Sequence, residues 1–533
     1  MTHTRDVSRQ AHESAADRRA RLDAVRHAFR GLHRADPVLD LDGRAGSRRR
    51  VYLDSTATTL MPDLVSAGLG DYFDSASANS HTIVHRAGRA TTEAIEASRR
   101  AVGALVGKHP ERDVVLLEGN GATGAINFLS RALFPPELRA ICKRAHGKDA
   151  DDLAAALGRA DPTLRERIER MRERPLVVIS LLEHHSNILP WIEAVGRHHV
   201  RVVGTTPDGR LDVEHYERIL QKEGHRVRLC ALSGASNVTG VLTPVHDLAE
   251  RAHAVGAQIM VDAAQLAPHR PIRMSRGGAG DLDYLVVSGH KMYAPGSRGV
   301  LVGPLEGIGC GCVGDVGGGM VEYVSRSDFR VKQEITAREE AGTPNIPGTI
   351  ALGMAARMLS RIGMDVVAAE ESALVEYALG RLLAIDGLRV YGPTEPHARV
   401  GVISVNVPGL RHAITAAYLD DVHAIAVRND CFCAHPYVKA LLECPDEVEA
   451  RHQAALDAGD RSQFPGMVRI SLGLYTTRDD LDAACEALTA AVRDKDRIAE
   501  RYAVDLQGNP RRTDRPMPEP VFDLDRAVDR WFG

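Results

Sequence analysis

The sequence lacks any run of about eighteen apolar residues, the length that a membrane-spanning helix requires. Residues 1–21 are polar and contain no apolar stretch of the kind found in secretory signals. Charge of neither sign predominates, because 67 Lys and Arg residues stand against 71 Asp and Glu residues for a formal net charge of -4. These absences argue against membrane and nucleic-acid partners, and we expect a cytoplasmic protein.

Cysteine is scarce and scattered, which excludes a disulfide scaffold and fits a reducing compartment. The eight cysteines are residues 142, 230, 310, 312, 431, 433, 444 and 485. The close pairs 310/312 and 431/433 raise the question of a metal or iron–sulfur site, as do His184 and His185. No further ligand set at metal-binding spacing accompanies the histidines, and the cysteine pairs alone define no geometry. We therefore predict no metal site.

The length of 533 residues suffices for two or three domains and a large core. With 44% hydrophobic and 26% charged residues, the composition is typical of a globular protein. Apolar residues at helical spacing predict one or two helices in an N-terminal extension over 1–50, although a partly ordered tail fits equally well. A similar spacing predicts a helical insert over 134–175.

Strands and helices alternate along more than a hundred residues of the middle of the chain. Apolar strand patterns lie at 176–182, 200–204, 227–232, 259–262 and 284–287, with helical patterns between several of them. Such alternation predicts a mostly parallel sheet with helices on both faces. Ligands of these sheets bind at the carboxyl ends of the strands, where His184, Asn237, Asp262 and Lys291 all fall.

The segment Ser288-Gly-His-Lys291 ends one of these strands at a turn rich in glycine and proline. A lysine that is desolvated there can lose its proton and attack a carbonyl carbon, as pyridoxal 5'-phosphate (PLP) chemistry requires. Asp262 ends the preceding strand, where its carboxylate can pair with a protonated pyridine nitrogen. The alternatives are an ordinary surface lysine and an aspartate that only shapes a turn.

A second glycine-rich turn, Gly119-Asn-Gly-Ala-Thr123, joins a strand to an apolar helix. Glycine lets backbone N–H groups approach an anion, and the helix N-terminus adds its dipole, so the turn is a candidate phosphate site. Such a turn is not specific to phosphate, because many helices begin with Gly and Thr.

Eight segments, in order over about 420 residues, resemble the class V branch of fold-type I PLP enzymes. The resemblance is greatest to the type II cysteine desulfurase and selenocysteine lyase group. The matching segments span residues 52–59, 121–127, 183–191, 236–240, 261–265, 288–291, 340–345 and 428–436. The resemblance implies a large PLP-binding α/β domain over 51–355, a smaller α+β domain over 356–503, and a tail over 504–533.

The resemblance also implies a role for each matched position. Lys291 would hold PLP covalently, Asp262 would pair with the pyridinium, Gln265 would bond the phenolic oxygen, and His184 would stack on the ring. The residues expected at the phosphate are Ala122, Thr123, Ser288, His290 and, from the other subunit of a homodimer, Thr343.

Substrate binding is assigned by the same resemblance to Asn237, Arg428 and Arg469, and the nucleophilic thiol to Cys433. Arginine suits a carboxylate because its guanidinium bonds both oxygens. The segment 428–433 places the cysteine five positions after the arginine, as in the short-loop type II enzymes. An ordinary small residue in a turn is the alternative for Cys433.

Several positions depart from the pattern of the desulfurases. Thr82 stands where arginine is usual, and Ala122 and Gly124 replace Thr and Glu in the phosphate turn. Glu339 stands where Phe is usual, and 429–432 replaces a run that contains histidine. Several of these departures are typical of divergent class V members, so the resemblance supports the cofactor more firmly than the substrate.

The expected function is removal of sulfur from L-cysteine or a related sulfur amino acid through a persulfide on Cys433, with release of L-alanine. A sulfur-acceptor protein is a further expected partner. One alternative is another class V reaction, a C–S β-lyase, an epimerase or an aminotransferase, with Cys433 as a bystander. The other is a non-enzymatic scaffold that binds partners through its extension and its insert.

Overall fold

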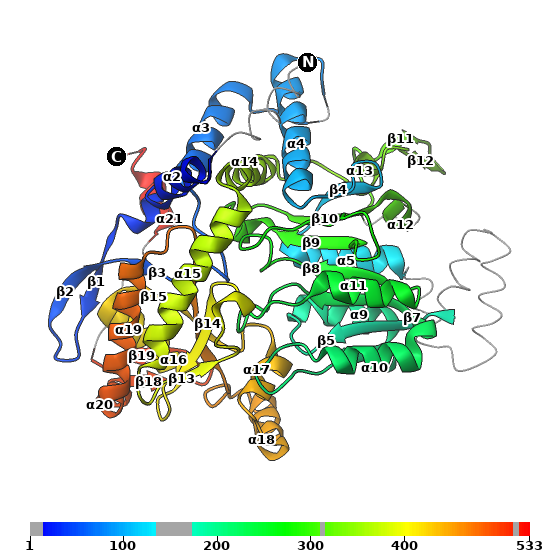
Figure 1. Cartoon of the computed structure of the whole chain (residues 1–533). Coiled ribbons are helices and arrows are strands. Elements are labelled where there is room, and N and C mark those ends of the chain that lie inside the picture. The colour runs from blue at the N-terminus through cyan, green and yellow to red at the C-terminus, as the bar shows by residue number, and fades with distance from the viewer. Residues whose placement is uncertain (1–13, 81, 135–172, 310–314, 515–521, 533) are drawn as a thin grey trace.

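The computed structural model describes residues 14–80, 82–134, 173–309, 315–514 and 522–532. Most of the predicted insert over 134–175 lies outside the described residues, as do Cys142, Cys310 and Cys312. The chain contains a large central sheet and a smaller sheet, which lie in different parts of the molecule (Figure 1). In the part of the chain that the structure describes, no helix is both long and apolar enough to cross a membrane.

The central sheet contains seven strands in the order β4-β10-β9-β8-β7-β5-β6. Strands β5 to β9 pair in parallel, and β10 runs antiparallel to both of its neighbours. The prediction of a mostly parallel sheet is confirmed. The strands are β4 (Asp113–Glu118), β5 (Leu176–Ser180), β6 (Val200–Val203), β7 (Val227–Ser233), β8 (Gln258–Asp262), β9 (Tyr284–Ser288) and β10 (Gly299–Pro304).

Alternate residues of each central strand enter different hydrophobic cores, because successive side chains of a strand point to opposite faces. Ile259 and Val261 of β8 belong to one core, whereas Met260 belongs to the other. In β9, Val287 belongs to the same core as Ile259 and Val261, whereas Val286 belongs to the same core as Met260. Both faces of the sheet are therefore buried, and its strands are almost continuously apolar.

Helices cover both faces of the sheet, as the alternation predicts. The side chains of α5 (Gly121–Leu133) and α9 (Leu189–Val195) line one core. The other core is lined by α4 (Arg86–Leu105), α10 (Val213–Glu223), α11 (Val245–Ala254) and α14 (Ile346–Ile362). Helix α3 (Asp63–Ala76) packs beside α4 and α14 (Figure 1).

The second sheet has four antiparallel strands in the order β13-β14-β17-β16. A third hydrophobic core joins it to helices α15, α16 and α19. The bounds are β13 (Arg389–Tyr391), β14 (Val402–Asn406), β16 (Arg428–Asp430), β17 (Met467–Ser471), α15 (Met364–Leu383), α16 (His412–His423) and α19 (Arg478–Arg493). Most buried residues of α14 belong to a core of the central sheet, and Ile346 and Ile350 pack with α3 and α4 instead; the domain boundary at 356 stays a prediction.

The segment predicted as one or two helices over 1–50 contains one described helix, α2 (Ala15–Arg26), and then a β-hairpin of β1 (Ala35–Leu39) and β2 (Ala45–Arg49). The prediction of helix is wrong for the second half. The reason is local, because Asp40 accepts hydrogen bonds from the N–H groups of Asp42 and Arg44 and closes the hairpin turn.

The predicted tail over 504–533 begins inside a second hairpin, β18 (Tyr502–Val504) and β19 (Pro510–Arg512). Arg512 is buried and donates to the carbonyl oxygens of Leu39 and Asp40, so the two hairpins are bonded to each other. The remaining elements are β3 (Val51–Tyr52), β11 (Val321–Val324), β12 (Phe329–Val331), β15 (Ile425–Ala426), α12 (Leu305–Gly309), α13 (Ile335–Glu339), α17 (His435–Leu441), α18 (Asp446–Asp457), α20 (Lys495–Glu500) and α21 (Leu524–Asp529).

Candidate active site

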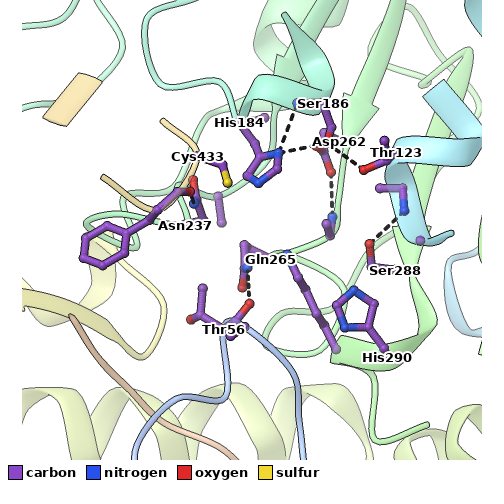
Figure 2. A pocket seen from close by; sticks show the side chains of 18 of the residues that line it. Thr56, Thr123, His184, Ser186, Asn237, Asp262, Gln265, Ser288, His290 and Cys433 are labelled. Atoms are coloured by element: carbon purple, nitrogen blue, oxygen red, sulfur yellow. Dashed lines mark hydrogen bonds between the residues drawn. The ribbon is translucent and has the colours of Figure 1, made fainter. Parts of the chain in front are cut away.

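A cavity of about 250 Å³ opens at the carboxyl ends of the central strands, where the sequence places the ligand (Figure 2). All of the predicted site residues except Thr343 line it. The predicted residues that line the cavity are Ala122, Thr123, His184, Asn237, Asp262, Gln265, Ser288, His290, Lys291, Arg428, Cys433 and Arg469. Sequence positions more than 300 residues apart therefore converge on one space.

Lys291 follows β9 on a single helical turn, Gly289–Lys291. Desolvation lowers the pKa of Lys291 to about 8, and the Asp262 carboxylate opposes part of that shift. The turn is held by a segment from much earlier in the chain, because Thr58 and Thr59 both donate to the carbonyl oxygen of His290. The lysine is thus fixed in place with an amine that loses its proton far more easily than a surface lysine.

Asp262 ends β8 with its side chain buried in the cavity. Burial raises the pKa of this carboxyl group, while a 2.9 Å hydrogen bond from the N–H of Ala264 and the charge of Lys291 act against the rise. Gln265 donates to the carbonyl oxygen of Thr56, and its own Oε1 atom is buried without a hydrogen-bond partner. A polar ligand in the cavity would satisfy that oxygen.

His184 presents a neutral imidazole to the cavity. Burial, together with the nearby Lys291 ammonium, lowers the pKa of His184 to about 3. Its Nδ1 accepts a 3.1 Å hydrogen bond from the N–H of Ser186, which leaves the ring proton on Nε2. Ser186 also bonds Thr123, with 2.6 Å between the hydroxyl oxygens, so the imidazole is joined to the start of α5.

The candidate anion cradle, Gly121 to Thr123 at the start of α5, lines the cavity. The N–H of Ala122 donates to Ser288 Oγ across 2.8 Å. Gly121 has φ +61°, and a Cβ atom at that position would lie 3.0 Å from the same hydroxyl oxygen, so glycine keeps the cradle open. His290 lies beside it, and burial lowers the pKa of this imidazole to about 4.

Arg469 reaches the cavity from β17, in the smaller sheet. Its guanidinium donates to Asp54 Oδ1 across 3.2 Å and to the carbonyl oxygen of Asn237 across 3.0 Å. The Nε atom is buried without a hydrogen-bond partner, and the group lies 4.7 Å from the centre of the Phe432 ring. Desolvation lowers the pKa of Arg469 to about 10, so the group remains a cation at neutral pH.

Cys433 lies on the loop after β16, and its side chain is exposed to the cavity. Phe432 and Cys433 both have positive φ, at +53° and +56°, a conformation that side chains rarely adopt. The loop is held from the central domain, because Asn237 Nδ2 donates to the carbonyl oxygen of Phe432 across 2.7 Å. In the described structure, the Asn237 side chain therefore bonds the Cys433 loop, whereas the resemblance assigns Asn237 to substrate binding.

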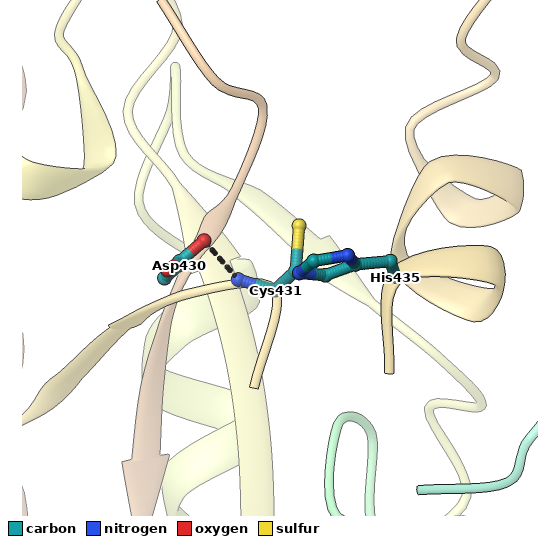
Figure 3. A group of neighbouring side chains, drawn as sticks. All are labelled: Asp430, Cys431 and His435. Carbon is teal, nitrogen blue, oxygen red and sulfur yellow. Dashed lines mark hydrogen bonds between the residues drawn. The ribbon is translucent and has the colours of Figure 1, made fainter. Parts of the chain in front are cut away.

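Asp430, Cys431 and His435, which flank Cys433 in the sequence, bring one ligand atom each to within 4.8 Å of one another. Figure 3 shows the three side chains. Each of the first two already has a protein partner. Asp430 accepts from the N–H of Cys431, and the Cys431 thiol donates to the carbonyl oxygen of Pro465. Burial raises the pKa of the Cys431 thiol to about 12, which favours the protonated form over a metal-binding thiolate.

Thr343 is exposed and does not line the cavity; its hydroxyl accepts from Asn79 Nδ2 across 3.2 Å. Thr56, Ser186 and Phe432 line the cavity without having been assigned a role from the sequence. The polar run over 52–59, which directly follows a strand, is the signal that could have located Thr56.

The residues of the cavity fit PLP. A lysine that can be neutral, a buried carboxylate, an open anion cradle and an unpartnered amide oxygen match its aldehyde, ring nitrogen, phosphate and polar ring substituents. With the mainly parallel sheet, this site defines a fold-type I PLP enzyme.

The family model of aminotransferase class-V proteins matches residues 51–145 and 163–484. The chain belongs to this family. It is 31% identical over 459 residues to a probable cysteine desulfurase of Halalkalibacterium halodurans, covering 85% of this chain and 95% of the relative.

Two solved structures are also similar. A cysteine desulfurase of Thermococcus onnurineus has a TM-score of 0.66 and 28% identity, covering 83% of this chain and 95% of that one. A cysteine desulfurase of Escherichia coli has a TM-score of 0.63 and 26% identity over the same shares of the two chains.

Proposed function

We propose that the protein is a PLP-dependent cysteine desulfurase, which takes sulfur from L-cysteine or a related sulfur amino acid and releases L-alanine. The observation that carries the proposal is that the Cys433 thiol lines the same cavity as the Lys291 amine. A scaffold without activity has no need of a desolvated lysine, a buried carboxylate and an anion cradle around one space.

Arg469 is the binding group for the substrate carboxylate. It is buried, it is a cation, and its Nε–H has no partner among the described residues. Asp54 and the Asn237 carbonyl hold the other nitrogens, so the orientation of the guanidinium is fixed before substrate arrives. Arg428 lines the same cavity and adds a second positive charge.

Lys291 moves the proton of the substrate Cα, because its pKa of about 8 lets it act both as base and as acid near neutral pH. PLP, when bound, supplies an electron sink for the negative charge at that carbon, and Asp262 is placed to keep the sink protonated. His184 stays neutral and contributes a flat ring against which a planar group can stack.

Cys433 accepts the sulfur. Its thiolate attacks the sulfur atom of the substrate, and the S–C bond breaks with its electron pair left on the substrate β-carbon. Protonation of that carbon gives alanine, and the enzyme keeps a persulfide on Cys433. A thiol on a sulfur-acceptor protein or small molecule then removes the outer sulfur. No external oxidant or reductant enters these steps.

We further propose a homodimer in which Thr343 completes the phosphate site of the partner subunit. Thr343 is exposed and does not line the cavity of its own chain, as such a role requires. Light scattering of the purified protein should give twice the chain mass. A monomer that binds PLP and turns over cysteine would remove this part of the proposal.

The test of the activity is product identification. The purified protein with cysteine and an excess of a dithiol, which reduces the persulfide and is oxidised to its disulfide, should give alanine and sulfide in equal amounts. Pyruvate would instead indicate β-elimination, and 3-mercaptopyruvate would indicate transamination. Cys433→Ser should abolish alanine formation and keep the absorbance of bound PLP. Cys444→Ser, at a half-buried cysteine outside the cavity, is the matched control and should remain active. Alanine formation by Cys433→Ser would remove the proposed nucleophile.

A further inference from the structure

A second cavity, of about 360 Å³, lies beside the active site at the edge of the smaller sheet. Its walls come from β16, the start of α16, the loop before β17 and the turn between β18 and β19. The lining residues with polar or charged side chains are Asp54, Arg411, His412, Arg428, Asn429, Asp430, Arg461, Ser462, Gln463, Gln507 and Asn509.

Three guanidinium groups face this cavity, from Arg411, Arg428 and Arg461. None of them forms an ion pair with another of the described residues. Of the two carboxylates in the lining, Asp54 is paired with Arg469, whereas Asp430 accepts a backbone N–H and keeps its negative charge, so three guanidinium groups face one carboxylate that no cation of the described residues neutralises. The cavity therefore offers unpaired positive charge, and an anion is the ligand that this charge favours.

The walls are held together by hydrogen bonds, so the cavity is built into the fold. Arg411 donates to the carbonyl oxygen of Ser462 across 3.1 Å. His412 Nε2 donates to the carbonyl oxygen of Phe464, which leaves Nδ1 to accept from Asn429. Arg411 and Asn429 are thus fixed against the loop that carries Arg461.

One wall comes from a part of the chain beyond the family match, which ends at residue 484. The N–H of Arg461 donates to the carbonyl oxygen of Leu506 across 2.7 Å and ties the turn at 507–509 to the cavity. Gly508, with φ +87°, lets that turn approach the Arg461 backbone closely. The second cavity is therefore a feature of this chain's C-terminal hairpin.

The second cavity adjoins the active site. Arg428 lines both cavities, and Asp54 lines the second while it bonds Arg469 in the first. Arg428 therefore lies between the second cavity and the cavity that Cys433 and Lys291 line.

We propose that the second cavity binds the anionic end of an extended small-molecule reactant, whose reactive end enters the active site. The chemical class is a carboxylate or phosphate group on either a sulfur amino acid or a thiol. This inference rests on the proposed desulfurase activity.

The thiol version has a balanced transfer step. The thiolate of the anionic acceptor attacks the outer sulfur of the Cys433 persulfide, the S–S bond breaks, and Cys433 leaves as a thiolate. The acceptor then carries the persulfide, and no further oxidant or reductant is consumed. The amino-acid version uses the same cavity for a charged group on the substrate itself.

The first test is direct binding, which needs no turnover. Calorimetry of the PLP-loaded, full-length protein with inorganic pyrophosphate should show saturable binding. Arg461→Gln and Arg411→Gln should each weaken it by about tenfold, as expected for the loss of a charged hydrogen bond. Arg451→Gln, at an exposed arginine of α18 outside the cavity, is the matched control. Absence of binding, or equal binding by Arg461→Gln and the control, would overturn the proposal.

The second test identifies the source of the anion. Glutathione serves as the anionic thiol with cysteine as donor, and S-sulfocysteine serves as the anionic amino acid. Arg461→Gln should raise the KM for one of these probes about tenfold relative to the KM for cysteine. The probe whose KM rises identifies whether the anionic group belongs to the thiol or to the amino acid. If Arg461→Gln leaves the KM for both probes unchanged relative to the KM for cysteine, the second cavity is not a reactant site.

The two proposals fail separately. Pyrophosphate binding without alanine formation from any amino acid would refute the desulfurase and leave only the anion site. Alanine formation without pyrophosphate binding would refute the anion site and leave the desulfurase.

Discussion

The backbone N–H of His185 donates a hydrogen bond to the carbonyl oxygen of Cys433 across 2.7 Å. His185 follows strand β5 of the central sheet and Cys433 lies on the loop after β16, so this hydrogen bond places the thiol over the ends of the central strands. Asn237 Nδ2 also donates a hydrogen bond to the carbonyl oxygen of Phe432. Two contacts across the domains therefore hold a loop whose φ angles are unfavourable.

Asn237→Ala should slow sulfur transfer more than it weakens substrate binding, because it removes the hydrogen bond to the loop that carries Cys433. The loss of about 1 kcal/mol corresponds to roughly a fivefold lower kcat. Steady-state kinetics with cysteine separate kcat from KM. A raised KM with unchanged kcat would instead place the amide on the substrate, as the resemblance implies.

Arg469→Lys should raise the KM for cysteine by roughly ten- to hundredfold, because a charged hydrogen bond to the carboxylate contributes about 1.5–3 kcal/mol and an ammonium cannot bond both oxygens. The variant should still bind PLP, which absorbance measures. Arg478→Lys, at an exposed position that begins α19, is a control for the change of residue type. An unaltered KM in Arg469→Lys would move the carboxylate site elsewhere.

The rate at which the PLP-free protein takes up PLP covalently should rise about tenfold per pH unit below pH 8 and level off above it, because only the neutral Lys291 amine attacks an aldehyde. Asp262→Asn should move this curve to lower pH, since the Asp262 charge raises the lysine pKa. Stopped-flow absorbance follows the reaction, and Lys291→Ala gives the background of surface lysines. A midpoint near pH 10 would contradict a desolvated amine.

Glu183 is fully buried and accepts hydrogen bonds from Ser180, Asn187 and both donors of Ser233. Desolvation nevertheless raises its pKa to about 7, above the value of 4.5 for an exposed glutamate. Between these values the folded state binds more protons than the unfolded state. Stability from this group is therefore present below pH 4.5 and is lost as pH rises through 7, by about 3 kcal/mol.

Glu183→Gln should remove that part of the pH dependence. The substitution should also lower the unfolding temperature at every pH by several degrees. The NH₂ group of glutamine would replace a carboxylate oxygen that accepts hydrogen bonds, and it would face donor groups instead. Thermal unfolding at pH 5 and pH 7.5 measures both effects. Glu376→Gln, at an exposed position of α15, serves as the control. Equal pH dependence in wild type and Glu183→Gln would show that another group titrates.

Local patterns predicted much of the fold. The alternation of apolar strands and helices identified the central sheet, since side-chain periodicity depends on neighbours in the chain. The N-terminal hairpin was missed, because its register is set by the turn at Asp40 and its position by contacts with the C-terminal hairpin, which also covers part of the segment predicted as a tail.

The residue types of the candidate site could be predicted from the sequence, whereas the hydrogen bonds between distant residues of the site could not. The turn Gly289–Lys291 follows a strand whose end the sequence marks, so Lys291 could be placed at the ligand edge. The polar run over 52–59 marked the region of Thr56 but not its place in the cavity, because that region lies more than two hundred residues before Lys291 in the chain.

The sequence by itself determined the alternating elements, the strand-end positions of Asp262 and Lys291, and the glycine that keeps the anion cradle open. These follow from interactions within a few residues of the chain. Only the tertiary structure decided that Asp54 orients Arg469, that His185 and Asn237 hold the Cys433 loop, and that the C-terminal hairpin closes a second cavity. The pairing of residues distant in the chain depends on how the sheets pack, and no local pattern encodes it.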